Sequence, residues 1–173
     1  MIEFRVEVAD VHSHRFLVTM RVGQPAPRQR LRLPVWIPGS YLVREFARHL
    51  SPLSAEQGGQ ARTVTPVDKA CWEIHTEGRG ALTVRYEVYA FDTSVRAAFL
   101  DAQRGFFNGT SVFLQAEGFE DGPQRVTLTN LPRQWQVVRS ASPGNPGRAA
   151  LRDAAVDKRG AHHPDVRGLS RTP

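Results

Sequence analysis

The sequence has a single cysteine, Cys71, and no long apolar run among its 173 residues. One cysteine excludes an internal disulfide and favours a reducing compartment. The residues after Met1 alternate between apolar and charged side chains and do not form the apolar core of a signal peptide. No stretch approaches the roughly 18 apolar residues of a membrane span. We therefore expect a cytoplasmic protein that does not interact with a membrane.

Motifs that carry catalysis are missing as well. None of the six histidines is followed by glutamate, so the zinc-binding His-Glu-x-x-His motif is absent. The sequence has no Gly-x-Ser-x-Gly nucleophile elbow and no glycine-rich phosphate loop. His12 and His14 are expected in a turn or at the start of a strand. His162, His163 and Asp165 lie in a segment where we expect no fixed ligand geometry. We therefore predict no catalytic residue and no metal site in this chain.

The net charge of +6 is unevenly distributed. Residues 139–173 contain seven basic and three acidic residues, and hence four of the six net positive charges. The rest of the chain is nearly balanced, so we expect no nucleic-acid partner. A nucleic-acid binder that uses this basic tail remains a minor alternative. It predicts salt-sensitive, sequence-independent binding that is lost when the tail is removed.

Apolar and polar residues alternate along most of the chain, which is typical of half-buried strands. The clearest run contains Leu82, Val84, Tyr86, Val88 and Ala90, separated by more polar residues. Turn-forming glycines and prolines separate most of the runs. The pattern predicts an all-β fold, an antiparallel β-sandwich or saddle. The other predicted strands are 2–8, 16–22, 31–35, 72–76, 112–115, 125–129 and 134–138.

Two segments depart from the alternation and predict short helices. Residues 42–50 have apolar side chains at helical spacing, and Ser40 is suited to cap the start. Residues 94–100 favour a second helical turn with Val95, Ala98 and Phe99 facing inward. Trp36 is expected in the core, and Asn108-Gly109 is expected to form a tight turn.

The tail from residue 139 has no aromatic residue and is rich in Arg, Ala, Gly and Pro. Ordering its backbone costs on the order of 1–2 kcal/mol per residue, and its few large apolar side chains return much less. We expect two regions: a β-domain over residues 1–138 and a mostly disordered tail over 139–173. A short helix is expected near residues 149–156.

Four stretches resemble one known family, in the same order along the chain. Residues 33–48, Leu-Pro-Val-Trp-Ile-Pro-Gly-Ser-Tyr-Leu-Val-Arg-Glu-Phe-Ala-Arg, resemble the LPxWxPGSYxxREFAR signature of the N-terminal domain of M61 (glycyl aminopeptidase-like) metallopeptidases. The other stretches are 68–74, 84–101 and 107–114. The resemblance covers about residues 1 to 138, and the signature and the 84–101 stretch carry most of its specificity.

The resemblance implies a multidomain aminopeptidase that favours N-terminal glycine or other small residues. In that family an N-terminal β-domain shapes the substrate cleft and packs on a thermolysin-like catalytic domain. That catalytic domain supplies the zinc and the general base, and a PDZ-like domain usually follows. This chain matches only the first part. We therefore expect it to be inactive alone, with no cofactor of its own and with the missing catalytic domain as its partner. Peptide substrate would bind only in the full-length context.

The resemblance stops near Val138, where strand periodicity is lost and residues typical of GC-rich codons begin. We interpret this as a truncation or a frameshift that replaced the true continuation and left a sheet edge prone to aggregation. If so, another reading frame downstream of the Val138 codon will encode His-Glu-x-x-His. DNA sequencing that finds no such frame would reject this hypothesis.

Five residues lie in or beside the family-like stretches and are our candidates for contact with substrate or with the catalytic domain. Local ion pairs on short helical segments are an equally good interpretation for the charged ones. A free-standing β-sandwich module that binds peptide or carbohydrate is the main alternative function. The candidates are Arg44, Glu45, Arg96, Asp101 and Asn108.

Overall fold

The computed structural model describes residues 1–36, 42–77, 79–94, 96–139 and 154–157. These residues form one six-stranded sheet, ordered β12-β1-β2-β8-β4-β5, and two four-stranded sheets, ordered β13-β14-β10-β9 and β11-β3-β7-β6. The helices are the 3-10 helix η1 (Phe46–His49) and the single-turn helix α1 (Gly109–Val112). The strands are β1 (Ile2–Asp10), β2 (Arg15–Val22), β3 (Arg28–Arg32), β4 (Ser54–Gln57), β5 (Gln60–Arg62), β6 (Val64–Asp68), β7 (Cys71–His75), β8 (Leu82–Tyr89), β9 (Ala98–Leu100), β10 (Arg104–Phe107), β11 (Gln115–Ala116), β12 (Gln124–Thr129), β13 (Gln136–Arg139) and β14 (Ala154–Asp157).

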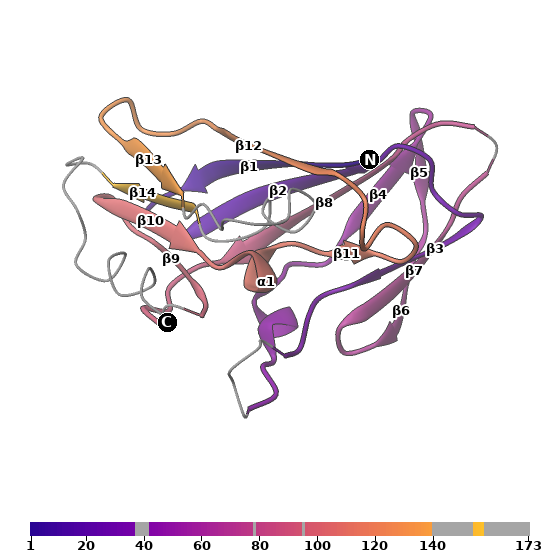
Figure 1. The fold of residues 1–173 in the computed structure, drawn as a ribbon, viewed down its shortest axis with the longest axis horizontal. Helices are drawn as coiled ribbons and strands as arrows, with labels where there is room; N and C mark the ends of the chain where they lie inside the picture. Colours follow the sequence, from indigo (N-terminus) through magenta and orange to yellow (C-terminus); the bar gives the residue numbers. More distant parts are fainter. Residues whose placement is uncertain (37–41, 78, 95, 140–153, 158–173) are drawn as a thin grey trace.

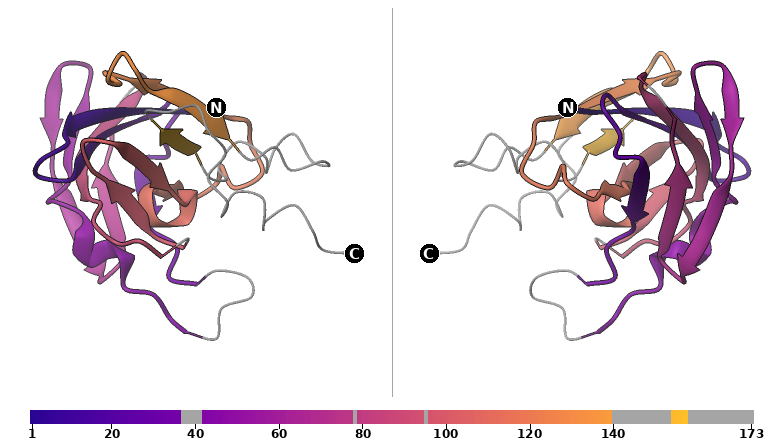
Figure 2. Two further views of the ribbon diagram at one scale, coloured as in Figure 1. Left: turned by 90° about the vertical axis from the view of Figure 1, so that its left-hand side faces the viewer. Right: turned by 90° about the vertical axis from the view of Figure 1, so that its right-hand side faces the viewer.

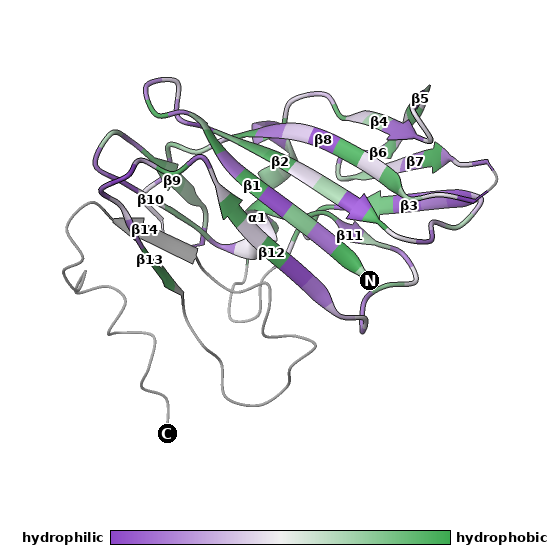
Figure 3. Cartoon of the chain, turned by 90° about the horizontal axis from the view of Figure 1, so that it is seen from above, coloured by the Kyte–Doolittle hydropathy of each residue, from purple (hydrophilic) through white to green (hydrophobic). Residues whose placement is uncertain are grey.

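Strands β1, β2 and β8 form the centre of the large sheet, and their alternation is visible in Figure 3. The antiparallel register places Val6 opposite Val18, and Val18 opposite Tyr86. Since paired residues share a face of the sheet, the alternate apolar positions that include these residues lie on one side, where they are buried. Each fully buried apolar side chain contributes about 1.5–3 kcal/mol to stability.

The opposite face of the large sheet is polar. Arg15 pairs with Glu87 at 2.6 Å, and Arg21 pairs with Glu3 at 3.1 Å. These partners lie on neighbouring strands, and all four side chains retain substantial exposure. Such exposed pairs contribute little stability, but they are typical of a surface that faces water.

The two small sheets and α1 lie on the apolar side of the large sheet, which curves around them in Figures 1 and 2. An aromatic cluster fills the space between the layers. The ring of Phe113, just after α1, lies 4.5 Å from that of Phe4 and 5.6 Å from that of Phe107. The Phe107 ring contacts that of Phe16 at 5.6 Å. One aromatic cluster therefore joins β1, β2, β10 and the α1 segment.

The predicted all-β class is confirmed, and the clearest alternating run forms β8. His12 and His14 lie in the turn between β1 and β2, as expected. One pairing differs from the antiparallel prediction, since β12 lies parallel to β1. Strand β14 lies inside the tail and pairs antiparallel with β10 and β13. The rest of the tail, 140–153 and 158–173, lies outside the described residues, and the division at residue 138 stays a prediction.

The helix predictions were largely wrong. In the first segment only Phe46–His49 is helical, as a 3-10 turn, and Ser40 lies outside the described residues. In the second, Ala98–Leu100 is strand β9, with all three residues buried, and Val95 is not described. Strand β14 replaces the end of the helix expected at 149–156.

Two single-residue predictions and one strand were also wrong. Trp36 is 55 % exposed and so does not belong to the core. Asn108 and Gly109 do not form a hairpin turn but begin α1, which takes up the first residue of the strand predicted at 112–115. The physical reason is a side-chain cap on the helix, which a sequence pattern of two turn-forming residues does not distinguish from a turn.

The buried hydroxyl of Tyr86 connects the large sheet to α1. It donates a hydrogen bond to the carbonyl oxygen of Val112 at 2.8 Å and accepts one from the amide of Leu114 at 3.4 Å. Burial raises the pKa of Tyr86 above its ordinary value, which keeps the phenol neutral and able to donate.

We expect Tyr86→Phe to lower the free energy of unfolding by about 1–3 kcal/mol, because two buried backbone groups lose their partner. Urea unfolding followed by circular dichroism measures the change. Tyr89→Phe is the control, since Tyr89 is on the same strand but 43 % exposed. Equal stability of the Tyr86 variant and the control would show that the hydroxyl has no such role.

Candidate functional site

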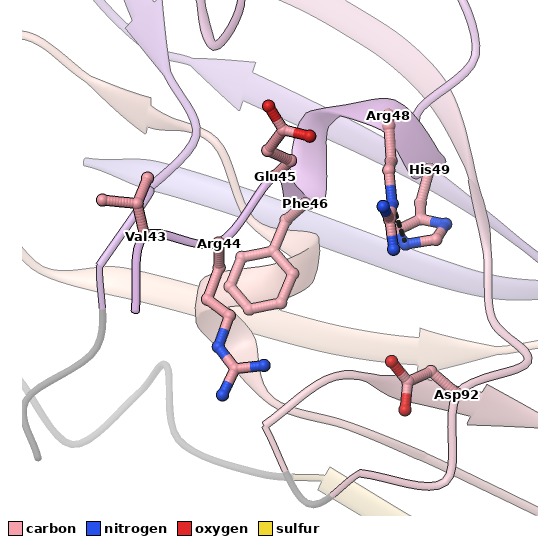
Figure 4. A pocket seen from close by; sticks show the side chains of 7 residues that line it. All are labelled: Val43, Arg44, Glu45, Phe46, Arg48, His49 and Asp92. Carbon is pink, nitrogen blue, oxygen red and sulfur yellow. Dashed lines mark hydrogen bonds between the residues drawn. The ribbon is translucent and has the colours of Figure 1, made fainter. Parts of the chain in front are cut away.

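An open pocket of about 300 Å³ lies beside η1 (Figure 4). One wall comes from η1 and the residues before it, and Asp92, which follows β8, stands on the other side. Helix η1 contacts α1, so the pocket rests on the part of the fold that Tyr86 holds in place. The lining residues are Val43, Arg44, Glu45, Phe46, Arg48, His49 and Asp92.

Arg44 is held by its backbone, whose amide donates a hydrogen bond to the carbonyl of Val35 at 2.7 Å. Its side chain extends beside the ring of Phe46, which is buried (Figure 4). The Nε atom of Arg44 is buried and has no hydrogen-bond partner in the described part of the chain. One donor of this charged side chain is therefore buried and unsatisfied, while the residue as a whole borders the pocket.

Arg48 and His49 lie together at the end of η1 that is farther along the chain from Arg44. The Nε atom of Arg48 donates a hydrogen bond to Nε2 of His49 at 3.2 Å. Burial, with the nearby positive charge of Arg48, lowers the pKa of His49, against the opposing effect of Asp92. His49 is thus a neutral acceptor near pH 7, and the two basic side chains add only one positive charge.

A row of stacked rings continues from the pocket across the small sheet, and we call Phe91, Phe99 and Phe106 the aromatic row. Phe91 pairs with Phe99 in a β-bridge, and Phe99 pairs with Phe106 in the β9–β10 register. Their ring centroids are 5.5 Å and 5.9 Å apart. Phe91 is 53 % exposed and directly precedes Asp92. The row therefore exposes Phe91 next to Asp92 in the chain, whereas its middle ring, Phe99, is buried.

Three exposed apolar side chains lie in the chain before η1, and one of them, Val43, lines the pocket. Trp36 is 55 %, Leu42 64 % and Val43 74 % exposed. We call these three residues the apolar flank. Exposed large apolar side chains are found at binding interfaces when they gather on one face.

The predicted residues Arg44 and Glu45 both line the pocket. Glu45 forms an ion pair with Lys69 at 3.6 Å, in which both side chains are largely exposed. Arg96 is exposed, and its backbone amide donates a hydrogen bond to Ser94. Among the described residues no ion pair includes Arg44, Arg96 or Asp101, so the local ion-pair interpretation fails for these three.

Asp101 and Asn108 make hydrogen bonds to the local backbone. Asp101 closes the turn between β9 and β10 by accepting hydrogen bonds from the amides of Gln103 at 2.7 Å and Arg104 at 2.8 Å. Asn108 caps α1 by accepting one from the amide of Thr110 at 3.0 Å. Both residues lie outside the pocket lining and help to hold the elements that surround it.

Sequence reasoning missed Arg48, His49 and Asp92 as members of the pocket. Arg48 is the last residue of the family-like signature, and His49 directly follows it. Asp92 lies within the 84–101 stretch. No spacing rule connects these positions, because the pocket forms only when the end of β8 meets η1.

No metal centre is evident in the part of the chain that the structure describes, where no three His, Cys, Asp or Glu side chains are grouped to hold an ion. The described helices are also too short to cross a membrane. Cys71 is buried at the start of β7, as a small core residue.

The fold and the site define a β-sheet domain with an open pocket and exposed apolar side chains. The family model of the peptidase M61 N-terminal domain matches residues 3–155. The chain belongs to this family.

A solved structure supports the assignment. An aminopeptidase N family protein from Idiomarina loihiensis is 35 % identical, superposes with a TM-score of 0.82, and is matched over 91 % of this chain and 29 % of its own. The chain thus spans less than a third of that relative. An M1 zinc metallopeptidase from Deinococcus radiodurans gives a TM-score of 0.48 at 13 % identity, over 90 % of this chain and 37 % of its own. No curated protein sequence matches the chain.

The cap on α1 leads to a test of Asn108. We expect Asn108→Ala to lower the free energy of unfolding by about 1 kcal/mol, because the amide of Thr110 loses its acceptor. Asn108→Asp keeps an acceptor and should lose much less. Chemical denaturation of the three proteins makes the comparison, and an alanine variant as stable as the aspartate variant would exclude the capping role.

Proposed function

We propose that this chain is the non-catalytic N-terminal β-domain of an M61-like zinc aminopeptidase. In this role it packs on a catalytic domain that is not part of the chain and shapes the cleft that receives the peptide. Zinc belongs to that catalytic domain, so the chain alone has neither cofactor nor activity. We also propose a cytoplasmic location, and neither nucleic acid nor membrane as a partner.

The observation that carries the proposal is the match to a peptidase N-terminal domain over most of the chain, together with the short share of the similar structure that it covers. The remainder of that relative is long enough for further domains. The sequence itself contains no His-Glu-x-x-His motif, which is consistent with chemistry located in another domain.

The two sides of the domain differ in polarity, and this difference favours one of them as the docking face. The polar face of the large sheet carries ion pairs such as Arg15–Glu87 and is suited to water. The apolar flank exposes three large side chains beside a pocket with charged walls. An interface with an apolar centre and polar specificity groups has this composition. We therefore propose that the catalytic domain covers the apolar flank and leaves the pocket at the edge of the cleft.

Two exposed aromatic rings favour a second candidate, a free-standing module that binds peptide or carbohydrate. The exposed rings of Phe91 and Tyr89 offer flat apolar surfaces of the kind that stack against sugars or peptide side chains. This candidate predicts that the isolated chain binds an oligosaccharide or a peptide without any catalytic domain, and glycan-array and peptide-array binding would reveal it.

The proposal can be tested in a chimera. This chain replaces the matching segment of the Idiomarina loihiensis protein, and hydrolysis of amino-acid amides reports catalysis. We expect turnover by the chimera.

A second experiment produces the N-terminal domain and the remainder of the chimera as separate chains and measures their association. The combined Trp36→Ala and Val43→Ala changes should weaken this association at least tenfold. Val137→Ala is the control, since Val137 is 51 % exposed on β13 and does not line the pocket. A stable chimera without turnover would contradict the proposal.

The five predicted residues are tested in the same chimera. Alanine at Arg44, Glu45, Arg96, Asp101 and Asn108 should lower turnover, either through the pocket or through the elements that support it. Unchanged docking and unchanged turnover would reject all five as interface or substrate residues.

A further inference from the structure

The charges of the pocket beside η1 balance as long as His49 is neutral. The lining contains the guanidinium groups of Arg44 and Arg48 and the carboxylates of Glu45 and Asp92. His49 is the remaining ionisable side chain of the lining, and a histidine changes its charge closer to neutral pH than arginine or a carboxylate does. One proton on His49 therefore changes the lining from balanced to positive.

Neutral His49 has a hydrogen-bond partner that a proton would displace. Nε of Arg48 donates a hydrogen bond to Nε2 of His49 at 3.2 Å. A guanidinium has only donors, so this bond requires an Nε2 atom without a proton. The imidazole stacks on the ring of Tyr89 with 6.4 Å between the centroids, and the next residue, Leu50, pairs with Val88 in a β-bridge. His49 is thus held in a defined place at the end of β8.

Asp92 is the acceptor for a protonated His49. Its carboxylate stands on the same side of the pocket as the Arg48–His49 pair in Figure 4, where no hydrogen bond joins it to either residue. Its Oδ1 atom accepts a hydrogen bond from the amide of Ser94 at 2.8 Å. Burial and the charge of Arg48 lower the pKa of His49, and the charge of Asp92 acts against both. Asp92 therefore lies near enough to influence the charge of the imidazole.

Among the described residues, the other acids near η1 have basic partners. Glu45 pairs with Lys69 at 3.6 Å, and Glu87 of β8 pairs with Arg15 at 2.6 Å. Helix α1, which contacts η1, contains no ionisable side chain. The remaining ionisable groups on the elements around His49 are Arg44 before η1, Tyr89 on β8, and His14 in the turn between β1 and β2, whose ring contacts that of Tyr89.

We propose that η1 contains an acid-sensitive switch in which His49 exchanges one partner for another. Neutral His49 accepts the hydrogen bond from Arg48. When His49 takes up a proton from solvent, it releases Arg48, which now carries a like charge, and donates a hydrogen bond to Asp92. The exchange rearranges the pocket and adds one positive charge beside Val43 of the apolar flank. It does not depend on the proposed function, because all three side chains belong to this chain.

The test records the imidazole and guanidinium resonances of the ¹³C,¹⁵N-labelled chain from about pH 8 to about pH 5. His49 should titrate below the value of 6.5 that is usual for histidine, and the Nε–H resonance of Arg48 should move with the same midpoint. Arg48→Gln should raise the midpoint of His49, because it removes a positive neighbour. Arg133→Gln is the matched control, since Arg133 is exposed and does not line the pocket.

Asp92→Asn tests the second partner. The asparagine oxygen still accepts from the amide of Ser94, so the local turn is kept, but the negative charge is lost. The midpoint of His49 should therefore fall, opposite to the effect of Arg48→Gln. An unchanged midpoint in the Asp92 variant would overturn the exchange of partners.

His49→Gln holds the switch in one state, because the glutamine oxygen can accept from Arg48 at every pH in this range. The Arg48 resonance should then show no transition, and this variant also serves if Arg48→Gln fails to fold. An Arg48 transition that persists without His49 would reject the proposal.

The lowered pKa of His49 also fixes the direction of a stability change. The unfolded chain protonates this histidine at a higher pH than the folded chain does, so stability is lost as the pH falls below 6.5 and levels off below the folded pKa. Between about pH 7 and about pH 5, the urea midpoint of His49→Gln should therefore fall less than that of the original chain. An equal fall in the two proteins would contradict the proposal.

Discussion

The registered pairing of β1, β2 and β8 is the constraint on which the rest of the structure depends. Their apolar residues lie on one face because alternation and register agree over the length of the strands. That face can only be buried by other elements, and the two small sheets and α1 cover it. Tyr86 belongs to this face, and its hydroxyl fixes the backbone after α1 by hydrogen bonds. The polar face remains available to water.

The pocket is a consequence of this arrangement rather than an independent motif. Helix α1 is placed by the large sheet, η1 contacts α1, and the end of β8 carries Phe91 and Asp92 to the same surface. Charged groups with few local partners thus gather beside exposed apolar residues. A domain with this surface is suited to binding, and the division of labour proposed for the peptidase leaves the bond-breaking chemistry to a separate unit.

The sequence predicts the strands that have one buried face and one exposed face. The strand over 82–89 alternates and was predicted correctly. All three residues of Ala98–Leu100 are buried. A run of this kind has no hydrophobic periodicity by which a strand could be distinguished from a helix. Leu42 and Val43 belong to a segment with helical spacing, but both are exposed in the structure. Arg44 could be selected from its motif, whereas its unsatisfied Nε and the approach of Asp92 depend on tertiary contacts that no local pattern records.

The parallel pairing of β1 with β12 has a consequence for synthesis of the chain. Ile2 lies opposite Gln124, so the first strand to leave the ribosome waits for one of the last described strands before both of its edges are paired. Contacts between distant segments form slowly because the intervening loop must close first. During translation β1 therefore has an exposed edge that can pair with other chains. The yield of native protein in the cell should consequently depend on the rate of translation and on chaperones that shield this edge, independently of the stability of the finished domain.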